Sequence, residues 1–158
     1  MKIRIVCVGK MKEDYFLKAQ KEYAKRLSRF ASLEIVELAD ERTPDRPTER
    51  EKQSVLKKEG ERVLRAAEGF DILSVLAVEA EQMDSEGFAA KLGEKEALGK
   101  SVCYVIGGSL GLSPAVMRRA DYALSFSRMT FPHQMMRVVL LEQIYRSERI
   151  QRNEPYHK

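Results

Sequence analysis

The sequence holds only two cysteines and two histidines and contains no tryptophan. Cys7 and Cys103 both lie inside apolar runs, where small buried core residues are expected. No CxxC motif occurs, and two histidines cannot complete a zinc site with these cysteines at any familiar spacing. A zinc centre is therefore excluded, and no metal is expected.

Long hydrophobic runs are also missing. None approaches the roughly 20 residues that a membrane-spanning helix needs. The opening segment, MKIRIVCVGK, is too short and too charged for a signal peptide. These features predict a cytoplasmic protein with no membrane partner.

A strong charge of one sign is absent as well, because 28 lysines and arginines face 24 acidic residues. The excess of +4 nevertheless lies at one end. Residues 117–158 hold eight basic and four acidic side chains, whereas residues 1–116 balance 20 against 20. A basic region beside a ligand loop suggests an anionic partner such as RNA, although a solvated helix face is the simpler interpretation of charge alone.

What the sequence does contain is a regular alternation of apolar runs and amphipathic segments. Strands are expected at 2–9, 33–38, 70–78, 101–106 and 121–126, and helices at 13–30, 49–67, 85–96 and 132–150. A further short helix should follow Ser113, placed to cap it, and Pro114 in its first turn. The pattern predicts one α/β domain, residues 1–158, with a mostly parallel sheet of about five strands flanked by helices.

A polar stretch at residues 39–48 holds Pro44 and Pro47 and has no apolar anchor, which predicts a mobile loop. It is either a flap that contacts RNA or, more simply, a solvated connection. Thr48 and Glu51 then form a capping-box pattern that predicts the start of the next helix.

Two loops follow the last two strands and should meet at one edge of the sheet, where open α/β sheets bind small ligands. The first is GGSLG at 107–111. No GK[ST] follows it, so it is not a P-loop, and its place late in the chain does not fit a dinucleotide fingerprint. Its glycines let backbone N–H groups approach a ligand, although a plain tight turn fits them equally well.

The second loop, residues 126–133, sets two phenylalanines and a methionine beside hydroxyls, an arginine and a histidine. A flat heteroaromatic ring such as adenine would fit between such side chains and exposed backbone amides. Core positions would explain the same apolar residues. The loops alone therefore leave open a non-catalytic module that binds an adenine nucleotide or RNA.

The runs IGGSLGLSP and LSFSRMTFPHQMMRVVLLEQIYR and the ending NEPYHK closely resemble the SPOUT-class methyltransferases, and within them the RlmH family. The opening segment and KEGERVL fit too, so the resemblance covers the whole chain. It implies a C-terminal trefoil knot, S-adenosylmethionine as cofactor and a homodimer. It also implies methylation of N3 of a pseudouridine in 23S ribosomal RNA.

Residue by residue, the resemblance implies cofactor contacts at three places in the chain. They are Leu76, Gly107 and the stretch Phe126, Ser127, Arg128, Met129, Thr130 and Phe131. The glycine loop itself, apart from the resemblance, indicates that Gly108 and Gly111 support it. The amphipathic last helix suits a partner face through Met135, Met136, Val139, Leu140 and Ile144, with contacts in the chain's own core as the alternative.

Transfer from a sulfonium needs no metal, but the N3 proton of the base has to be removed. His133 and His157 are the candidate bases. His133 falls in the first turn of the last helix, where the dipole disfavours its charged form, and a packing role is the alternative. Arg137, one turn later, is predicted to hold a phosphate or a base carbonyl, or else to form a structural salt bridge.

His157 has no packing reason to be in the tail PYHK. We expect the tail to fold over the site of its own chain or of the partner subunit, with Tyr156 stacking on a flipped base. A net charge of +4 and the lack of a separate RNA-binding domain predict a substrate recognised by shape, within an assembled ribosomal particle.

Overall fold

Strands and helices alternate along the whole chain, as the sequence predicts. The computed structural model describes residues 1–158. In chain order its elements are β1 (Lys2–Val8), α1 (Asp14–Leu27), β2 (Ser32–Leu38), α2 (Glu49–Ala66), β3 (Ile72–Gln82), α3 (Ser85–Ala97), β4 (Val102–Ile106), α4 (Pro114–Arg119), β5 (Tyr122–Ser125) and α5 (His133–Gln151).

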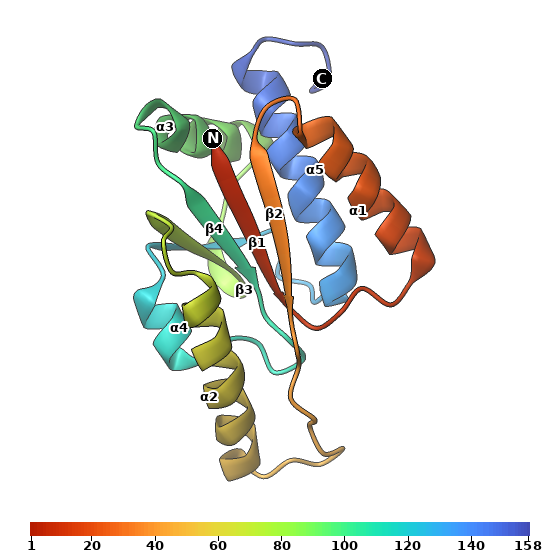
Figure 1. The fold of residues 1–158 in the computed structure, drawn as a ribbon, viewed down its shortest axis with the longest axis vertical. Coiled ribbons are helices and arrows are strands. Elements are labelled where there is room, and N and C mark those ends of the chain that lie inside the picture. Colours follow the sequence, from red (N-terminus) through yellow and green to blue (C-terminus); the bar gives the residue numbers. More distant parts are fainter.

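The five strands form one sheet in the order β2-β1-β4-β3-β5, and every neighbouring pair is parallel (Figure 1). In the register, Ile5 of β1 lies between Ile35 of β2 and Tyr104 of β4. Because all strands run the same way, the loops that follow them meet at one edge. The predicted α/β class is confirmed.

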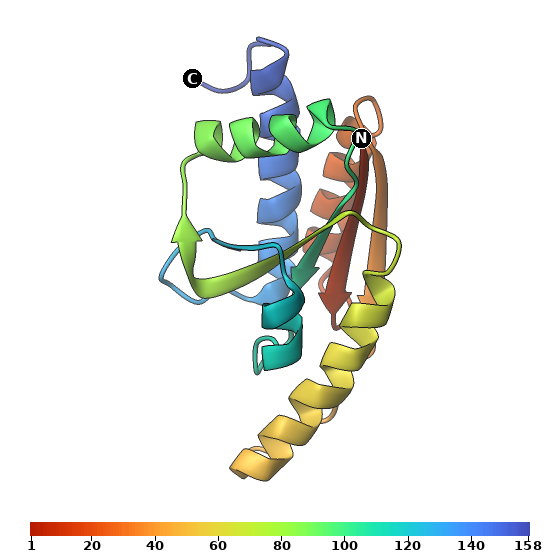
Figure 2. The same ribbon diagram turned by 90° about the vertical axis from the view of Figure 1, so that its left-hand side faces the viewer.

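Helices cover both faces of the sheet (Figure 2). Ile3, Ile5 and Cys7 of β1 face a core that α1, α3 and α5 complete, whereas Val6 and Val8 face a second core under α2 and α4. Side chains of β1 therefore alternate between the two cores, and the expected burial of both cysteines is confirmed.

Helix α5 belongs mainly to the chain's own core. Leu140, Leu141 and Ile144 are fully buried, and each contributes about 1.5–3 kcal/mol by leaving water. The suggestion that Leu140 and Ile144 serve a partner face is therefore wrong. Met135, in the first turn of the helix, does remain exposed.

The predicted helix starts are confirmed at atomic detail. Thr48 Oγ1 accepts from the backbone N–H of Glu51, whose side chain returns the bond, so the capping box is complete. Ser113 Oγ accepts from Val116 N at 3.3 Å, with Pro114 in the first turn of α4.

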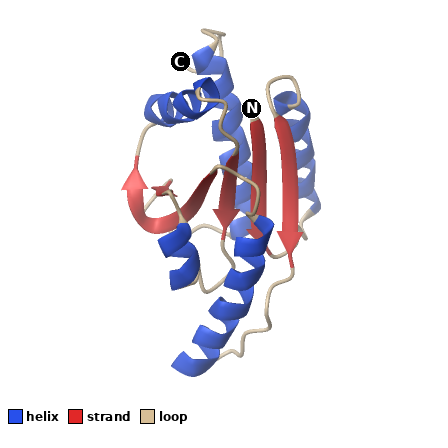
Figure 3. Ribbon diagram, turned by 60° about the vertical axis from the view of Figure 1, so that its left-hand side comes forward, coloured by secondary structure: helices blue, strands red, loops and turns tan.

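Strand β3 is the element that the sequence misjudges. It continues to Gln82 rather than ending at Val78, and Leu76 and Glu81 both pair with Leu124 of β5 across a register shift. The C-terminal end of β3 carries exposed acidic side chains. It therefore lacks the apolar pattern from which a strand is predicted. Figure 3 shows it curving out of the sheet toward α3.

None of the helices has the length and apolar character that crossing a bilayer requires. The knot implied by the resemblance stays a prediction.

Candidate functional site

Three neighbouring strands bring the predicted cofactor segments together. Val75 of β3 pairs with Val105 of β4, and Leu76 pairs with Leu124 of β5. Leu76 therefore lies at the carboxyl edge between the strand ends that lead into Gly107 and Phe126. This edge is where parallel sheets bind ligands.

The glycine loop closes on itself at this edge. Gly111 N donates to Gly108 O at 3.0 Å, and Gly111 has a φ of +81°, a region that side chains disfavour. A Cβ on Gly107 would lie 2.6 Å from Gly111 O, too close for any side chain. The loop thus presents bare backbone, which suits close approach of a ligand.

The loop after β5 is held by its serines, packs Phe126 against Phe88 of the core, and presents Met129 and Phe131 to solvent. Ser125 Oγ donates to Val78 O at 3.0 Å, and Ser127 Oγ accepts from Met129 N at 3.0 Å. Met129 is 71% exposed and Phe131 is 40% exposed, so neither is a core residue. Bare backbone on one loop and unpacked apolar side chains on the other fit a nucleoside cofactor.

Arg128 of this loop lines a cavity of about 500 Å³ whose other walls come from the end of β3. Those walls are Val78, Glu79, Ala80 and Gln82. Their part in the site escaped sequence reasoning because β3 was expected to end earlier.

His133 begins α5 and faces the end of β1. Its Nε2 lies 3.3 Å from the position that a Cβ on Gly9 would occupy. The next residue, Gln134, accepts through Oε1 from the backbone of Lys12 at 2.8 Å and Glu13 at 3.1 Å. These two residues directly precede α1, so the first turn of α5 is tied to the segment that leads into that helix.

Arg137 ties the same turn to β1 and β2. Its side chain is fully buried, and Nη1 donates to Glu37 at 2.9 Å and to Gln20 at 3.1 Å. Nη2 donates to Gly9 O at 3.2 Å. This ion pair is the structural salt bridge that the sequence analysis gave as the alternative role of Arg137. Because the guanidinium is buried, it does not reach a phosphate, and the predicted phosphate contact is wrong.

The environment of Glu37 favours its charged form. Burial alone would raise the pKa of the carboxyl. Hydrogen bonds from Arg137 and from Met11 N–H, with the positive charges of Arg137 and Lys10, outweigh burial and lower the pKa below its usual value.

The C-terminal tail folds back onto α5 of the same chain. The Tyr156 ring meets the Tyr145 ring edge-on, with centroids 5.0 Å apart, and Tyr156 Oη donates to Glu142 at 3.1 Å. Burial, followed by the contacts with Tyr23 and Glu142, raises the pKa of Tyr156. His157 Nδ1 lies 3.2 Å from an Arg146 nitrogen. Tyr156 therefore does have a packing partner, which the sequence did not reveal.

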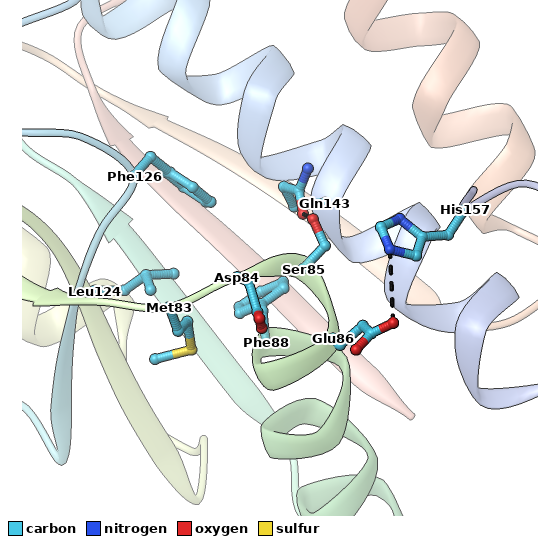
Figure 4. A pocket seen from close by; sticks show the side chains of 9 residues that line it. All are labelled: Met83, Asp84, Ser85, Glu86, Phe88, Leu124, Phe126, Gln143 and His157. Carbon is cyan, nitrogen blue, oxygen red and sulfur yellow. Dashed lines mark hydrogen bonds and ion pairs between the residues drawn. The ribbon is translucent and has the colours of Figure 1, made fainter.

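The tail borders a second cavity, of about 400 Å³, shown in Figure 4. Four apolar side chains and five polar ones line it, namely Met83, Phe88, Leu124 and Phe126, and Asp84, Ser85, Glu86, Gln143 and His157. His157 Nε2 lies 3.9 Å from Glu86. Phe126 belongs both to this cavity and to the predicted cofactor loop. The sequence did not predict that the first turn of α3 would line the cavity.

Most cations of the C-terminal end are paired within the fold. Five of the eight form ion pairs, with Arg119, Arg137, Arg146, Arg149 and Arg152 each contacting a carboxylate. Four of these pairs use acids of the same region, which the excess of +4 already counts, and one uses Glu37. Most of the positive excess therefore remains, and Arg118, Arg128 and Lys158 have no acidic partner. No group of three or more potential metal ligands occurs either.

Comparison with known proteins agrees with this geometry. The family described as "Predicted SPOUT methyltransferase" matches residues 1–157. Ribosomal RNA large subunit methyltransferase H of Bifidobacterium animalis is 52% identical over the full length of both chains. The protein of that name from Streptococcus gordonii is 50% identical, again over both full lengths.

Solved structures share the fold at low sequence identity. A probable methylase family protein from Haemophilus influenzae superimposes with a TM-score of 0.60 at 13% identity, covering 99% of this chain and 70% of that one. TrmJ from Z. mobilis gives 0.55 at 13% identity, covering 98% and 72%. These likenesses show the fold, and the family match over residues 1–157 shows that the chain belongs to the SPOUT methyltransferase family.

Proposed function

We propose that this chain is an S-adenosylmethionine-dependent methyltransferase that acts on large-subunit ribosomal RNA at N3 of a pseudouridine. Family membership supports methyl transfer, and relatives with about half of their residues identical carry the name of a ribosomal RNA large subunit methyltransferase. The observation that carries the proposal is the convergence of Leu76, Gly107 and Phe126 at one sheet edge.

S-adenosylmethionine, when bound, supplies a methyl group already activated by the sulfonium. Leu76, Gly107, Gly108 and the stretch 126–131 would hold it. The exposed backbone of the glycine loop can donate and accept hydrogen bonds, and Met129 and Phe131 offer apolar surface to a ring. Holding the acceptor nitrogen in line with the donor is the main requirement of the reaction.

Acid–base chemistry falls to the histidines. His133 lies in the first turn of α5, and an imidazole there is a candidate proton acceptor. His157 lies between Arg146, whose nitrogen is 3.2 Å from Nδ1, and Glu86, which is 3.9 Å from Nε2. One of the two histidines would take the N3 proton, and Tyr156 would position the nucleobase.

We also propose that the protein forms a homodimer, in which the C-terminal tail residues complete the site of methyl transfer. Exposed Met129, Phe131 and Met135 all lie near the start of α5, and an exposed apolar group of this kind suits a subunit interface. The enzyme would act in the cytoplasm on an assembled ribosomal particle, which a small domain recognises by shape.

The test is transfer of an isotope-labelled methyl group from S-adenosylmethionine to ribosomal particles, with the product located by mass spectrometry of RNA fragments. Label at N3 of one pseudouridine supports the proposal. Label elsewhere would overturn the assigned atom. Cofactor binding without transfer to any ribosomal RNA would favour a binding module instead.

A further inference from the structure

Unpaired positive charge gathers on a part of the molecule outside the predicted site. We call residues 42–58, the end of the 39–48 loop with the first half of α2, the α2 arm. It holds six basic and three acidic residues: Arg42, Arg46, Arg50, Lys52, Lys57 and Lys58, against Asp45, Glu49 and Glu51. Among these cations only Lys52 has an acidic partner, Glu49 at 3.0 Å.

The α2 arm extends past the carboxyl edge of the sheet (Figures 1 and 3). Val55 is its only buried residue, at 7% exposure. Arg42, Arg46 and Arg50 are all exposed and form no side-chain hydrogen bond. Packing therefore explains none of these three arginines.

The root of the α2 arm is fixed. Arg62 Nη1 donates to Ala39 O at 2.8 Å, and its other terminal nitrogen pairs with Glu41. Glu59 is 5% exposed, and its Oε1 accepts from Glu41 N at 2.9 Å. Residues 39–41 are thus held on α2, in contrast to the mobile loop expected from the sequence.

The same carboxylate touches the glycine loop. Glu59 Oε2 lies 3.4 Å from the position that a Cβ on Gly108 would occupy. One side chain therefore separates the root of the α2 arm from the predicted cofactor loop. Any RNA whose base reaches the predicted cofactor site has its flanking phosphates near the same edge of the sheet.

We propose that the α2 arm binds phosphates of the RNA substrate, an inference that rests on the proposed action on ribosomal RNA. Arginine pairs bidentately with phosphate, and such contacts set the register of a nucleic acid without reading its sequence. Glu59 and Arg62 act as positioning residues that hold the arm beside the glycine loop.

The test compares two variants of the full chain with equal loss of charge. Arg46→Gln/Arg50→Gln removes two exposed, unpaired cations from the α2 arm. Lys25→Gln/Arg65→Gln removes two exposed, unpaired cations from the last turns of α1 and α2, at the opposite edge. Binding of a single-stranded RNA oligonucleotide is measured by fluorescence anisotropy at several salt concentrations.

On a single strand, each lost phosphate contact lowers the slope of log affinity against log salt by about 0.7. The arm variant is expected to lose about 1.4 units of slope, and the control variant none. Its KM for ribosomal particles should rise several-fold, with kcat and the affinity for S-adenosylmethionine unchanged.

Equal slopes and equal KM values for the two variants would overturn the inference. A raised KM with an unchanged slope would also overturn it, because the arm would then contact a ribosomal protein. Failure of the unaltered protein to methylate any ribosomal RNA refutes the proposed function instead, whatever the slopes.

Discussion

The ion pair between Glu37 and Arg137 gives a sharp test of how α5 is held against the carboxyl edge. Glu37→Met leaves the guanidinium of Arg137 fully buried with only Gln20 and Gly9 O as partners. Arg137→Met leaves a carboxylate whose side chain is 35% exposed and which keeps the hydrogen bond from Met11 N. The two single substitutions are therefore not equivalent.

The structure sets the magnitude. At the 2.9 Å separation of the charged atoms, their attraction is roughly 6 kcal/mol at an effective dielectric constant of about 20. Desolvation offsets part of this, and removing one partner of a buried pair costs about 3–5 kcal/mol. Because water reaches Glu37, we expect Glu37→Met to cost about 3 kcal/mol and Arg137→Met clearly less.

The assay is equilibrium urea unfolding at a fixed protein concentration, with both single variants and the double variant. Adding Arg137→Met to Glu37→Met should recover stability, because it removes the stranded charge. A double variant less stable than Glu37→Met alone would refute this interpretation of the network.

The pH dependence has a definite sign. The pKa of Glu37 is lower in the folded chain than its ordinary value of 4.5, so its stabilisation is present above that value and is lost as the pH falls through the folded pKa. The unaltered protein should therefore lose more stability in acid than Glu37→Met does. Parallel curves would contradict this.

Three further outcomes are expected. Gly107→Ala puts a Cβ 2.6 Å from Gly111 O, so calorimetry should show cofactor affinity at least about tenfold weaker, with Ser109→Ala in the same loop unchanged. His157→Gln should lower kcat with the cofactor Kd retained, and an unaltered kcat would remove this residue from the mechanism. Thr48→Ala breaks the capping box and should cost about 1 kcal/mol in urea unfolding, whereas no loss would contradict the cap.

The sequence predicts the elements well because their signals are local. The alternation in β1 and the capping box of α2 need only a few adjacent residues. The end of β3 fails because Glu79 and Glu81 lie on an exposed strand, where backbone pairing leaves no hydrophobic pattern.

Long-range partners are what the sequence hides. Arg137 and Glu37 are 100 residues apart in the sequence, and no local pattern predicts their contact. The contact between Tyr156 and Tyr145 likewise joins residues that no local pattern connects. The predicted cofactor segments, by contrast, converge as expected, because strand ends in a parallel sheet share an edge whatever their distance along the chain.

The most direct test of the central claim is a crystal structure grown with S-adenosylmethionine. The account predicts the nucleoside at the carboxyl edge, against Leu76, the backbone of Gly107 and residues 126–131. A nucleoside seated only in the cavity beside His157, or no binding at the carboxyl edge in a chain that still transfers methyl groups, would contradict it.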